Sequence, residues 1–256
     1  MFWKNKIVFL TGASSGIGAA LASEMAMRGA IVGLLARRAE LLKEISVEIE
    51  RGGGIARIFA VDITDANAVA GAAQSLRDEF GGIDILIANA GIGGNNRETR
   101  NLEAEGVTEV INTNLIGAVN SVAAVLPSML KRRSGQLIAI SSLAGFRGLP
   151  KSAAYCASKA GMTAFFESVR LDVQNRGVHV TIIQPGFIKT PLTSGRGAKM
   201  PFLMELQDAI PLFLDAVEKK KKFAAFPWQM AAIVRVAGFL PASLYDKIAA
   251  AAAFRE

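Results

Sequence analysis

The chain has 256 residues, of which 51% are apolar, so it can bury one large core as a single domain over residues 1–256. Its formal charge of +7 suits an anionic partner, such as a phosphorylated small molecule or an acidic membrane surface. Apart from the run at 219–222, the basic residues are spread along the chain without interleaved aromatics, which excludes a typical nucleic-acid-binding module. The single cysteine, Cys156, excludes an internal disulfide and fits a reducing, cytoplasmic location.

The first predicted unit is a strand, a glycine-rich turn and a helix. Residues 6–11 form a short β-rich run, and an Ala-rich helical pattern follows over about 17–28. Glycines in such a turn let the backbone approach a pyrophosphate, and the helix N-terminus offers free amides and the positive end of its dipole. The residues expected at the pyrophosphate are Gly12, Ser14, Ser15, Gly16, Ile17 and Gly18.

The second predicted strand, over 30–36, indicates which dinucleotide is bound. It is followed by Arg37 and Arg38, with no acidic residue before Glu40. An enzyme that uses NAD(H) normally has Asp or Glu here for the ribose 2′-hydroxyl, whereas an arginine suits the 2′-phosphate of NADP(H). We therefore expect NADP(H) to be favoured over NAD(H), with Arg37 at the 2′-phosphate.

Two further predicted strands end in polar residues. The run over 54–62 ends in Asp62, and the uninterrupted apolar run over 83–91 contains Asn89 near its end. Such runs are typical of buried parallel strands, whose functional residues lie at their carboxyl ends. Asp62 also fits a capped turn that opens a helix over 66–80, and both interpretations stay open.

The most informative stretch runs from Ser141 to Lys159. Tyr155 and Lys159 stand four residues apart in a segment with helical apolar spacing, so their side chains emerge one turn apart on the same face. An ammonium beside a phenol favours the phenolate, as a general acid/base working near neutrality requires. Ser142 can donate a second hydrogen bond to the same carbonyl oxygen, and two donors polarise a carbonyl towards hydride attack. For an isolated YxxxK, an ordinary surface pair is the alternative.

The rest of the chain is predicted to build the substrate side. A strand over 177–186 contains the only histidine, so neither a histidine-based triad nor a metal site is expected. We expect a polar loop at 91–101 to form part of the substrate rim and residues 191–204 to form a mobile lid. An apolar helical extension over about 227–254 is expected to cover an apolar site or subunit contact, and to touch a membrane only peripherally.

These motifs together resemble those of the short-chain dehydrogenase/reductase family. The resemblance covers residues 5 to about 195 and rests on TGASSGIG from residue 11, ANAG from 88, YCASK from 155 and PGFIKT from 185, in the family's order and spacing. It implies an α/β fold of the Rossmann type, with a doubly wound, seven-stranded parallel sheet. It also implies a homodimer or homotetramer formed through the helices that carry Asn114 and Tyr155.

The resemblance also implies roles for single residues. Asn114, in a helix expected over about 107–133, would complete a proton relay through a bound water next to Lys159. The expected contacts are Asp62 and Ile63 with adenine, Asn89, Ala90 and Gly91 beneath the cofactor, and Tyr155, Lys159, Pro185, Gly186, Ile188 and Thr190 around the nicotinamide half.

We therefore predict an NADP(H)-dependent oxidoreductase that interconverts a ketone and a secondary alcohol. The large apolar residues of the lid and the tail favour a lipid-like or steroid-like substrate over a sugar. Two alternatives use the same fold without chemistry: a dinucleotide-sensing regulator and a membrane-associated interaction protein. The intact Tyr155 and Lys159 pair argues against the first, and a spectrophotometric turnover assay would distinguish the second from an enzyme.

Overall fold

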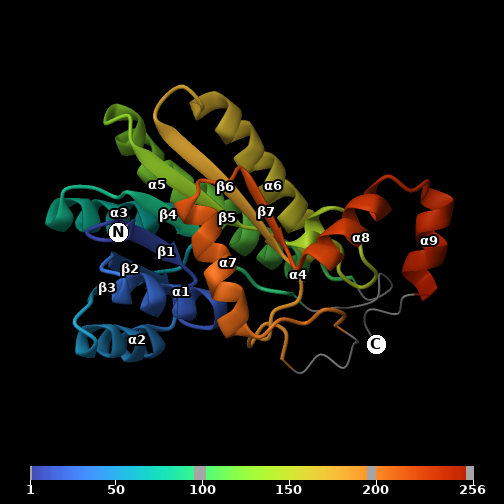
Figure 1. Ribbon diagram of the computed structural model, residues 1–256, viewed down its shortest axis with the longest axis horizontal. Helices are drawn as coiled ribbons and strands as arrows, with labels where there is room; N and C mark the ends of the chain where they lie inside the picture. The colour runs from blue at the N-terminus through green and yellow to red at the C-terminus, as the bar shows by residue number, and fades with distance from the viewer. Residues whose placement is uncertain (1, 95–101, 195–199, 252–256) are drawn as a thin grey trace.

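The computed structural model describes residues 2–94, 102–194 and 200–251, and the chain folds around one parallel sheet (Figure 1). The strand order is β3-β2-β1-β4-β5-β6-β7, which confirms the predicted doubly wound α/β fold. The strands are β1 (Ile7–Thr11), β2 (Ile31–Ala36), β3 (Ile55–Ala60), β4 (Ile85–Ala88), β5 (Gly135–Ile140), β6 (Val178–Pro185) and β7 (Phe223–Phe226).

The central strands are apolar at nearly every position because helices cover both faces of the sheet. In β1, Val8 pairs with Val32 of β2 on one side and with Ile85 of β4 on the other. The chain order reverses between these two neighbours, since β2 and β3 extend the sheet in one direction and β4 to β7 in the other. Ligands of open α/β sheets bind at this reversal, outside the carboxyl ends of the strands.

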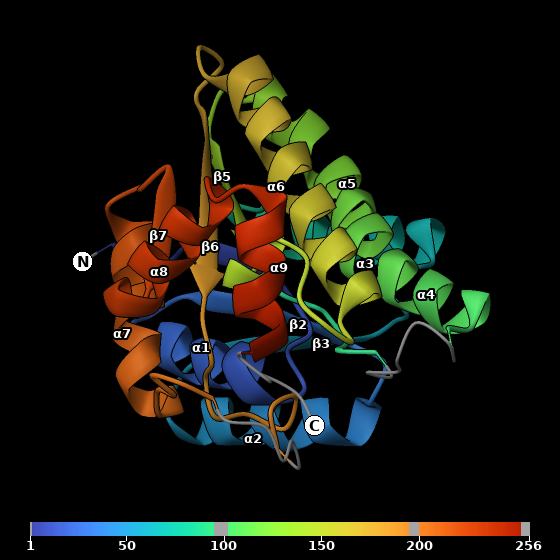
Figure 2. The same ribbon diagram turned by 90° about the vertical axis from the view of Figure 1, so that its right-hand side faces the viewer.

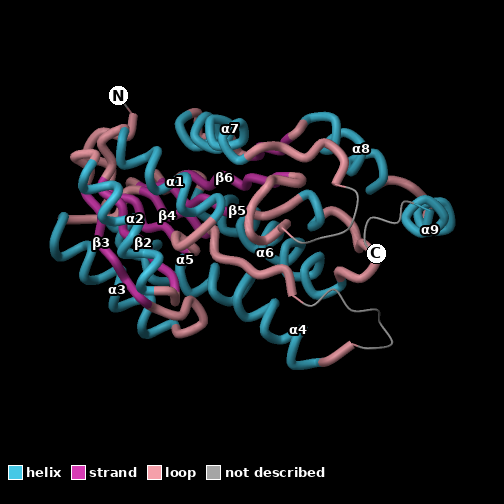
Figure 3. The backbone as a smooth tube through the Cα atoms, turned by 90° about the horizontal axis from the view of Figure 1, so that it is seen from below, coloured by secondary structure: helices cyan, strands magenta, loops and turns pink. Residues whose placement is uncertain are grey.

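Helices lie in one layer on each side of the sheet (Figures 2 and 3). One core cluster joins α1, α2 and α7 to the sheet, and the other joins α3, α5 and α6 to its opposite face. The helices are α1 (Gly16–Met27), α2 (Ala39–Arg51), α3 (Ala66–Phe80), α4 (Ala104–Ile111), α5 (Gly117–Lys131), α6 (Ala153–Val173), α7 (Leu206–Glu218), α8 (Trp228–Gly238) and α9 (Ala242–Ala251).

The helix expected over 107–133 is not regular. It begins at Ala104 and changes to one π-helical turn, Asn112–Ile116, before α5 continues to Lys131. Hydrophobic spacing does not reveal such a turn, since it adds only a local register shift. The span Ala104–Lys131 is, within the described residues, the one helix long and apolar enough to cross a bilayer, and 39% of its most apolar window is buried inside the protein.

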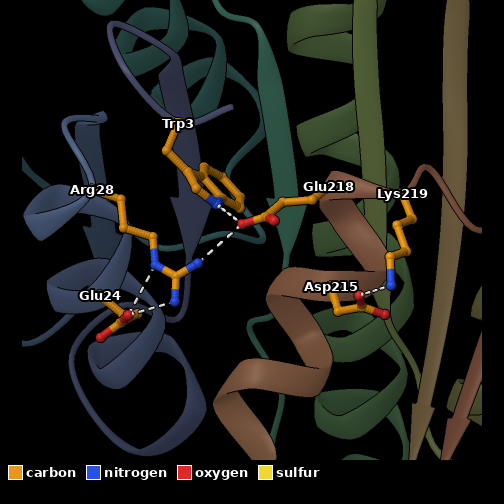
Figure 4. Close-up of polar contacts among 6 residues, drawn as sticks. All are labelled: Trp3, Glu24, Arg28, Asp215, Glu218 and Lys219. Carbon is orange, nitrogen blue, oxygen red and sulfur yellow. Dashed lines mark hydrogen bonds and ion pairs between the residues drawn. The ribbon is translucent and has the colours of Figure 1, made fainter. Parts of the chain in front are cut away.

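The N-terminus is fastened to the end of α7 by a polar cluster (Figure 4). The carboxylate of Glu218 accepts hydrogen bonds from the indole N–H of Trp3 and from the guanidinium of Arg28 at 3.1 Å. Arg28 also pairs with Glu24 one turn earlier on α1, at 2.8 Å. These contacts fix α7 beside α1 and thereby position β7, the element that follows α7.

The apolar extension expected over about 227–254 follows β7 and contains two helices, α8 and α9, that project beyond the carboxyl ends of the strands (Figure 1). The lysine run at 219–222 precedes β7 and α8 follows it, so the strand separates the lysines from the exposed face of α8. Lys219 and Lys221 both pair with Asp215. Met204, at the end of the expected lid, forms an isolated parallel β-bridge with Ile188. Residues 195–199 of that lid and 95–101 of the expected rim lie outside the described residues.

Candidate active site

The glycine-rich turn brings the start of α1 against the ends of β1 and β4. Gly12 and Gly16 have φ of +66° and +57°, in the left-handed region where other residues are strained. A Cβ on Gly12 would lie 2.7 Å from the Cα of Ala90, and one on Gly18 would lie 2.1 Å from the carbonyl oxygen of Gly12. Side chains are therefore excluded at Gly12 and Gly18, because the turn packs closely against Ala90 and against the start of α1.

The first turn of α1 leaves its backbone amides available. Its N-cap residue is Ser15, whose side chain makes no capping hydrogen bond, and the first turn holds no acidic residue. The first amides of a helix have no intrahelical acceptor, and together with the helix dipole they favour an anion. This end of α1 therefore fits the pyrophosphate of a dinucleotide.

Asn89 connects the two strands at the reversal of the sheet. Its side-chain amide donates to the carbonyl oxygens of Thr11 at 3.0 Å and of Gly12 at 3.1 Å. The hydroxyl of Thr11 accepts from the backbone amides of Asn89 and Ala90, at 3.0 and 3.1 Å. Asn89 thus holds the glycine turn in place from below.

The two arginines after β2 point in different directions. Arg37 pairs at 3.7 Å with Asp62 and its side chain is 60% exposed. Arg38 instead donates to the hydroxyls of Ser14 and Ser15, at 2.8 and 2.7 Å, and lines the pocket. Successive residues leave an extended backbone on opposite sides, which separates the neighbouring side chains. The pocket wall therefore receives Arg38, while the role expected for Arg37 stays a prediction.

Lys159 is enclosed at the centre of the site. Its side chain is 4% exposed and its Nζ donates to the carbonyl oxygen of Ile140 at 2.8 Å. Burial lowers the pKa of Lys159 from 10.5 to about 8, because the charged form loses its hydration. At pH 7 the lysine still carries its proton, and its Nζ lies 5.9 Å from the centre of the Tyr155 ring.

Ser142 completes the expected trio. It is the second residue after β5 and caps a 3₁₀ turn, where its hydroxyl oxygen accepts from the amide of Ala144 at 3.1 Å. This contact orients the oxygen and leaves the O–H as a donor. Ser142, Tyr155 and Lys159 all line one pocket, of about 350 Å³, with the glycine turn.

Asn114 lies beneath the site rather than on its wall. Its side chain is buried, accepts from the amide of Ile92 at 2.8 Å, and donates to the hydroxyl of Ser158 at 3.0 Å. A Cβ on Gly91 would lie 3.2 Å from the Asn114 oxygen and 3.5 Å from the Nζ of Lys159. Asn114 therefore ties the loop after β4 to α6, next to the buried lysine.

The pocket collects most of the predicted residues. Those on its wall are Gly12, Ser14, Ser15, Gly16, Ile17, Asn89, Gly91, Ser142, Tyr155, Lys159, Pro185, Gly186, Ile188 and Thr190. Gly18, Arg37, Asp62, Ile63, Ala90 and Asn114 are not among its lining residues. Ile63 is buried in the core, whereas Asp62 accepts from the amide and hydroxyl of Thr64. Those hydrogen bonds lower the pKa of Asp62, which keeps it ionised.

The geometry agrees with a comparison against known families. A family model described as short chain dehydrogenase matches residues 6–201. The chain belongs to the short-chain dehydrogenase/reductase family. It is an oxidoreductase of that family by sequence as well as by fold.

Relatives span nearly the whole chain. A Myxococcus xanthus (strain DK1622) protein called an uncharacterized oxidoreductase is 42% identical over 244 residues, which cover 95% of this chain and 96% of that protein. A fatty acyl-CoA reductase of Acinetobacter baylyi (strain ATCC 33305 / BD413 / ADP1) is 34% identical over 226 residues, covering 86% of this chain and 75% of that protein. A crystal structure of a metagenomic short-chain oxidoreductase in complex with NADP has a TM-score of 0.74 and 29% identity, covering 88% of this chain and 96% of that one.

Several pocket residues were not predicted from the sequence. Arg38 lines the dinucleotide end, and the distal end is lined by Arg147 together with side chains of α8 and α9, including Met230 and Tyr245. The pair of arginines was a usable signal for Arg38. No sequence pattern linked Arg147 to a tail about 90 residues further along the chain.

Among the described residues, no group of three or more His, Cys, Asp and Glu side chains is placed to hold a metal ion. Cys156, which follows Tyr155 in the sequence, has a buried side chain.

Proposed function

We propose that this protein is an NADP(H)-dependent oxidoreductase that interconverts a ketone and a secondary alcohol on an apolar substrate. The observation that carries the proposal is the meeting of Ser142, Tyr155 and Lys159 in one pocket with the glycine turn of α1. A hydroxyl, a phenol and a buried ammonium beside a dinucleotide site are the groups that carbonyl reduction requires.

The residues present fit a dinucleotide with a 2′-phosphate. The amides at the start of α1 suit the pyrophosphate, and two adjacent arginines follow β2 with no acidic residue before Glu40 in the sequence. Arg38 is held at the pocket wall by Ser14 and Ser15, and Arg37 lies at the open edge beside Asp62. The NADP complex of the structural relative supports the same choice.

The side chains have separable tasks in the proposed reaction. When bound, NADPH supplies the hydride that attacks the carbonyl carbon. Tyr155 gives its proton to the carbonyl oxygen, while Ser142 donates a hydrogen bond to that oxygen. The positive charge of Lys159 favours the phenolate left on Tyr155, and burial makes this effect stronger than it would be in water. We propose that Asn114, which borders the lysine, completes the path by which the proton is replaced.

The distal half of the pocket supports an apolar substrate. Its wall includes Leu143, Phe187, Met230 and Val234. Leu143 and Met230 belong to a small buried apolar cluster, and Phe187 and Val234 pack against it. One relative is named a fatty acyl-CoA reductase, and a fatty acyl chain is likewise apolar. The presence of Ser142, Tyr155 and Lys159 in one pocket also favours an enzyme over a silent dinucleotide sensor.

We further propose a homodimer or homotetramer formed through α4, α5 and α6. Two large apolar side chains on these segments are exposed in the single chain, Ile116 and Leu171. A cytoplasmic location with peripheral membrane contact through α8 is also proposed, since Trp228, Val236 and Phe239 of that segment are exposed.

The experiment that tests the proposed function is a panel of ketones followed by the absorbance of NADPH. We expect oxidation of NADPH with apolar ketones, faster than with sugars and faster than oxidation of NADH. No turnover of any carbonyl or alcohol with either dinucleotide would contradict the proposal.

A further inference from the structure

A single arginine joins the loop after the catalytic serine to the C-terminal helices. The guanidinium Nη1 of Arg147 donates to the carbonyl oxygens of Ala237 and Leu240, both at 2.7 Å. These carbonyls belong to the end of α8 and the turn after it, where the Ala237 oxygen also accepts from the backbone amide of Leu240 at 3.3 Å. A positive charge at this end also interacts favourably with the helix dipole. Arg147 thus caps α8 from outside the helix.

The same arginine holds α9. Its guanidinium carbon lies 4.0 Å from the centre of the Tyr245 ring, and the hydroxyl of Tyr245 donates to the carbonyl oxygen of Gly148 at 2.6 Å. Burial raises the pKa of Tyr245 against a smaller opposing effect of Arg147, so the phenol stays a neutral donor at pH 7. We call Arg147 and Tyr245, with the carbonyls that they bind, the clamp.

The clamp borders the pocket that contains Ser142 and Tyr155. Apolar side chains of the 143–150 loop, α8 and α9 line the same pocket, among them Leu143, Leu149, Met230, Ile233, Val234 and Ile248. Ile233 and Ile248 line the pocket and yet are 55% and 47% exposed. An apolar group that lies against them would remove this surface from water.

We propose that the clamp holds α8 and α9 as the wall of a distal subsite, and that this subsite binds an apolar tail attached to the reacting carbonyl. Arg147 and Tyr245 are positioning residues in this arrangement, because they act through the helices that they fasten. The inference rests on the proposed function for its carbonyl chemistry. The tail-binding role itself is independent of turnover.

Chain length of the substrate provides the main test. With methyl ketones from four to twelve carbons, each methylene that enters the subsite should raise kcat/KM of the wild-type enzyme by up to about fourfold. In Arg147→Met, which keeps an apolar stem but removes the donors and the charge, we expect the slope of log kcat/KM against chain length to fall by at least half. The loss should appear as a rise in KM for the long ketones. Arg51→Met, which removes an exposed arginine at the end of α2, should keep the wild-type slope.

A binding measurement separates this inference from the proposed function. The fluorescence of methyl cis-parinarate, a neutral chain, reports binding without any reaction, and Arg147→Met should weaken its binding at least fivefold. If no ketone is reduced but the probe binds and Arg147→Met weakens its binding, the subsite stands while the proposed chemistry fails.

Should Arg147→Met not fold, Tyr245→Phe takes its place, because it removes only the hydrogen bond to Gly148. We then expect a change of at least twofold in the chain-length slope and in the binding of the probe. Unchanged slope and unchanged probe binding in the folded variant would overturn the inference. Equal losses of activity at every chain length with unchanged probe binding would overturn it as well.

Discussion

Replacing the buried lysine should make the protein more stable while it removes activity. Burial lowers the pKa of Lys159 from 10.5 to about 8, so the folded protein holds the lysine proton less tightly than the unfolded chain does. Below pH 8 the lysine is charged in both states, and the folded state bears the whole free-energy cost of burying that charge. That cost decreases as the pH rises from 8 towards 10.5, where the lysine is neutral in both states. Lys159→Met removes the charge and keeps a similar side-chain length.

The size of the effect follows from the two pKa values. The interval from 10.5 to about 8 corresponds to roughly 3 kcal/mol at pH 7. By the same linkage relation, about 1 kcal/mol of it remains at pH 10. The variant loses the hydrogen bond from Nζ to the carbonyl oxygen of Ile140, which costs about 1 kcal/mol at either pH. We therefore expect Lys159→Met to exceed the wild type by about 2 kcal/mol at pH 7, or about 4–8 °C in Tm, and to match it near pH 10.

Urea unfolding at pH 7 and pH 10, with Lys159→Met compared with wild type, measures this difference. The control is Lys43→Met, an exposed position on α2, which should change the free energy of unfolding by less than about 0.5 kcal/mol at both values of pH. A Lys159→Met protein less stable than wild type at pH 7 would refute the reasoning. So would a stability difference that is the same at pH 7 and pH 10.

Two further predictions concern the dinucleotide and the tail. Arg37→Asp should raise the Kd of NADPH at least tenfold more than that of NADH, since it replaces a charge-assisted contact of about 1.5–3 kcal/mol with repulsion. Equal changes in the two dissociation constants, measured by calorimetry, would exclude a contact of Arg37 with the 2′-phosphate. Binding to anionic liposomes in flotation should be reversed by high salt and weakened by Phe239→Asp, because Phe239, which directly follows α8, is 91% exposed. Binding that survives both salt and carbonate would contradict a peripheral contact.

The central strands of the sheet could be predicted because parallel strands with both faces covered are continuous apolar runs, and β1, β4 and β5 are each followed by a glycine or a polar residue. The glycine turn was predictable for a similar reason, since the close approach of Gly12 and Gly18 permits no side chain. The π-helical turn around Asn114 was not, because one extra residue per turn leaves the hydrophobic spacing nearly unchanged.

Parts of the site depend on tertiary geometry that the sequence does not reveal. Arg37 and Arg38 are chemically identical neighbours, and only the path of the backbone after β2 decides that Arg38 reaches Ser14 and the pocket. Arg147 meets Ala237 and Tyr245 through the folding of a tail that local patterns describe only as apolar and helical.

The proposed activity is tested most directly by comparing Tyr155→Phe with the wild type, using NADPH and an apolar ketone at pH 7. The variant removes one phenolic oxygen and leaves the glycine turn, the arginines and Lys159 in place. We predict that the Kd of NADPH stays within about twofold while kcat falls by about 10² or more, the usual contribution of a positioned general acid. A Tyr155→Phe enzyme that keeps more than half of the wild-type kcat would contradict the assignment of Tyr155 as the proton donor.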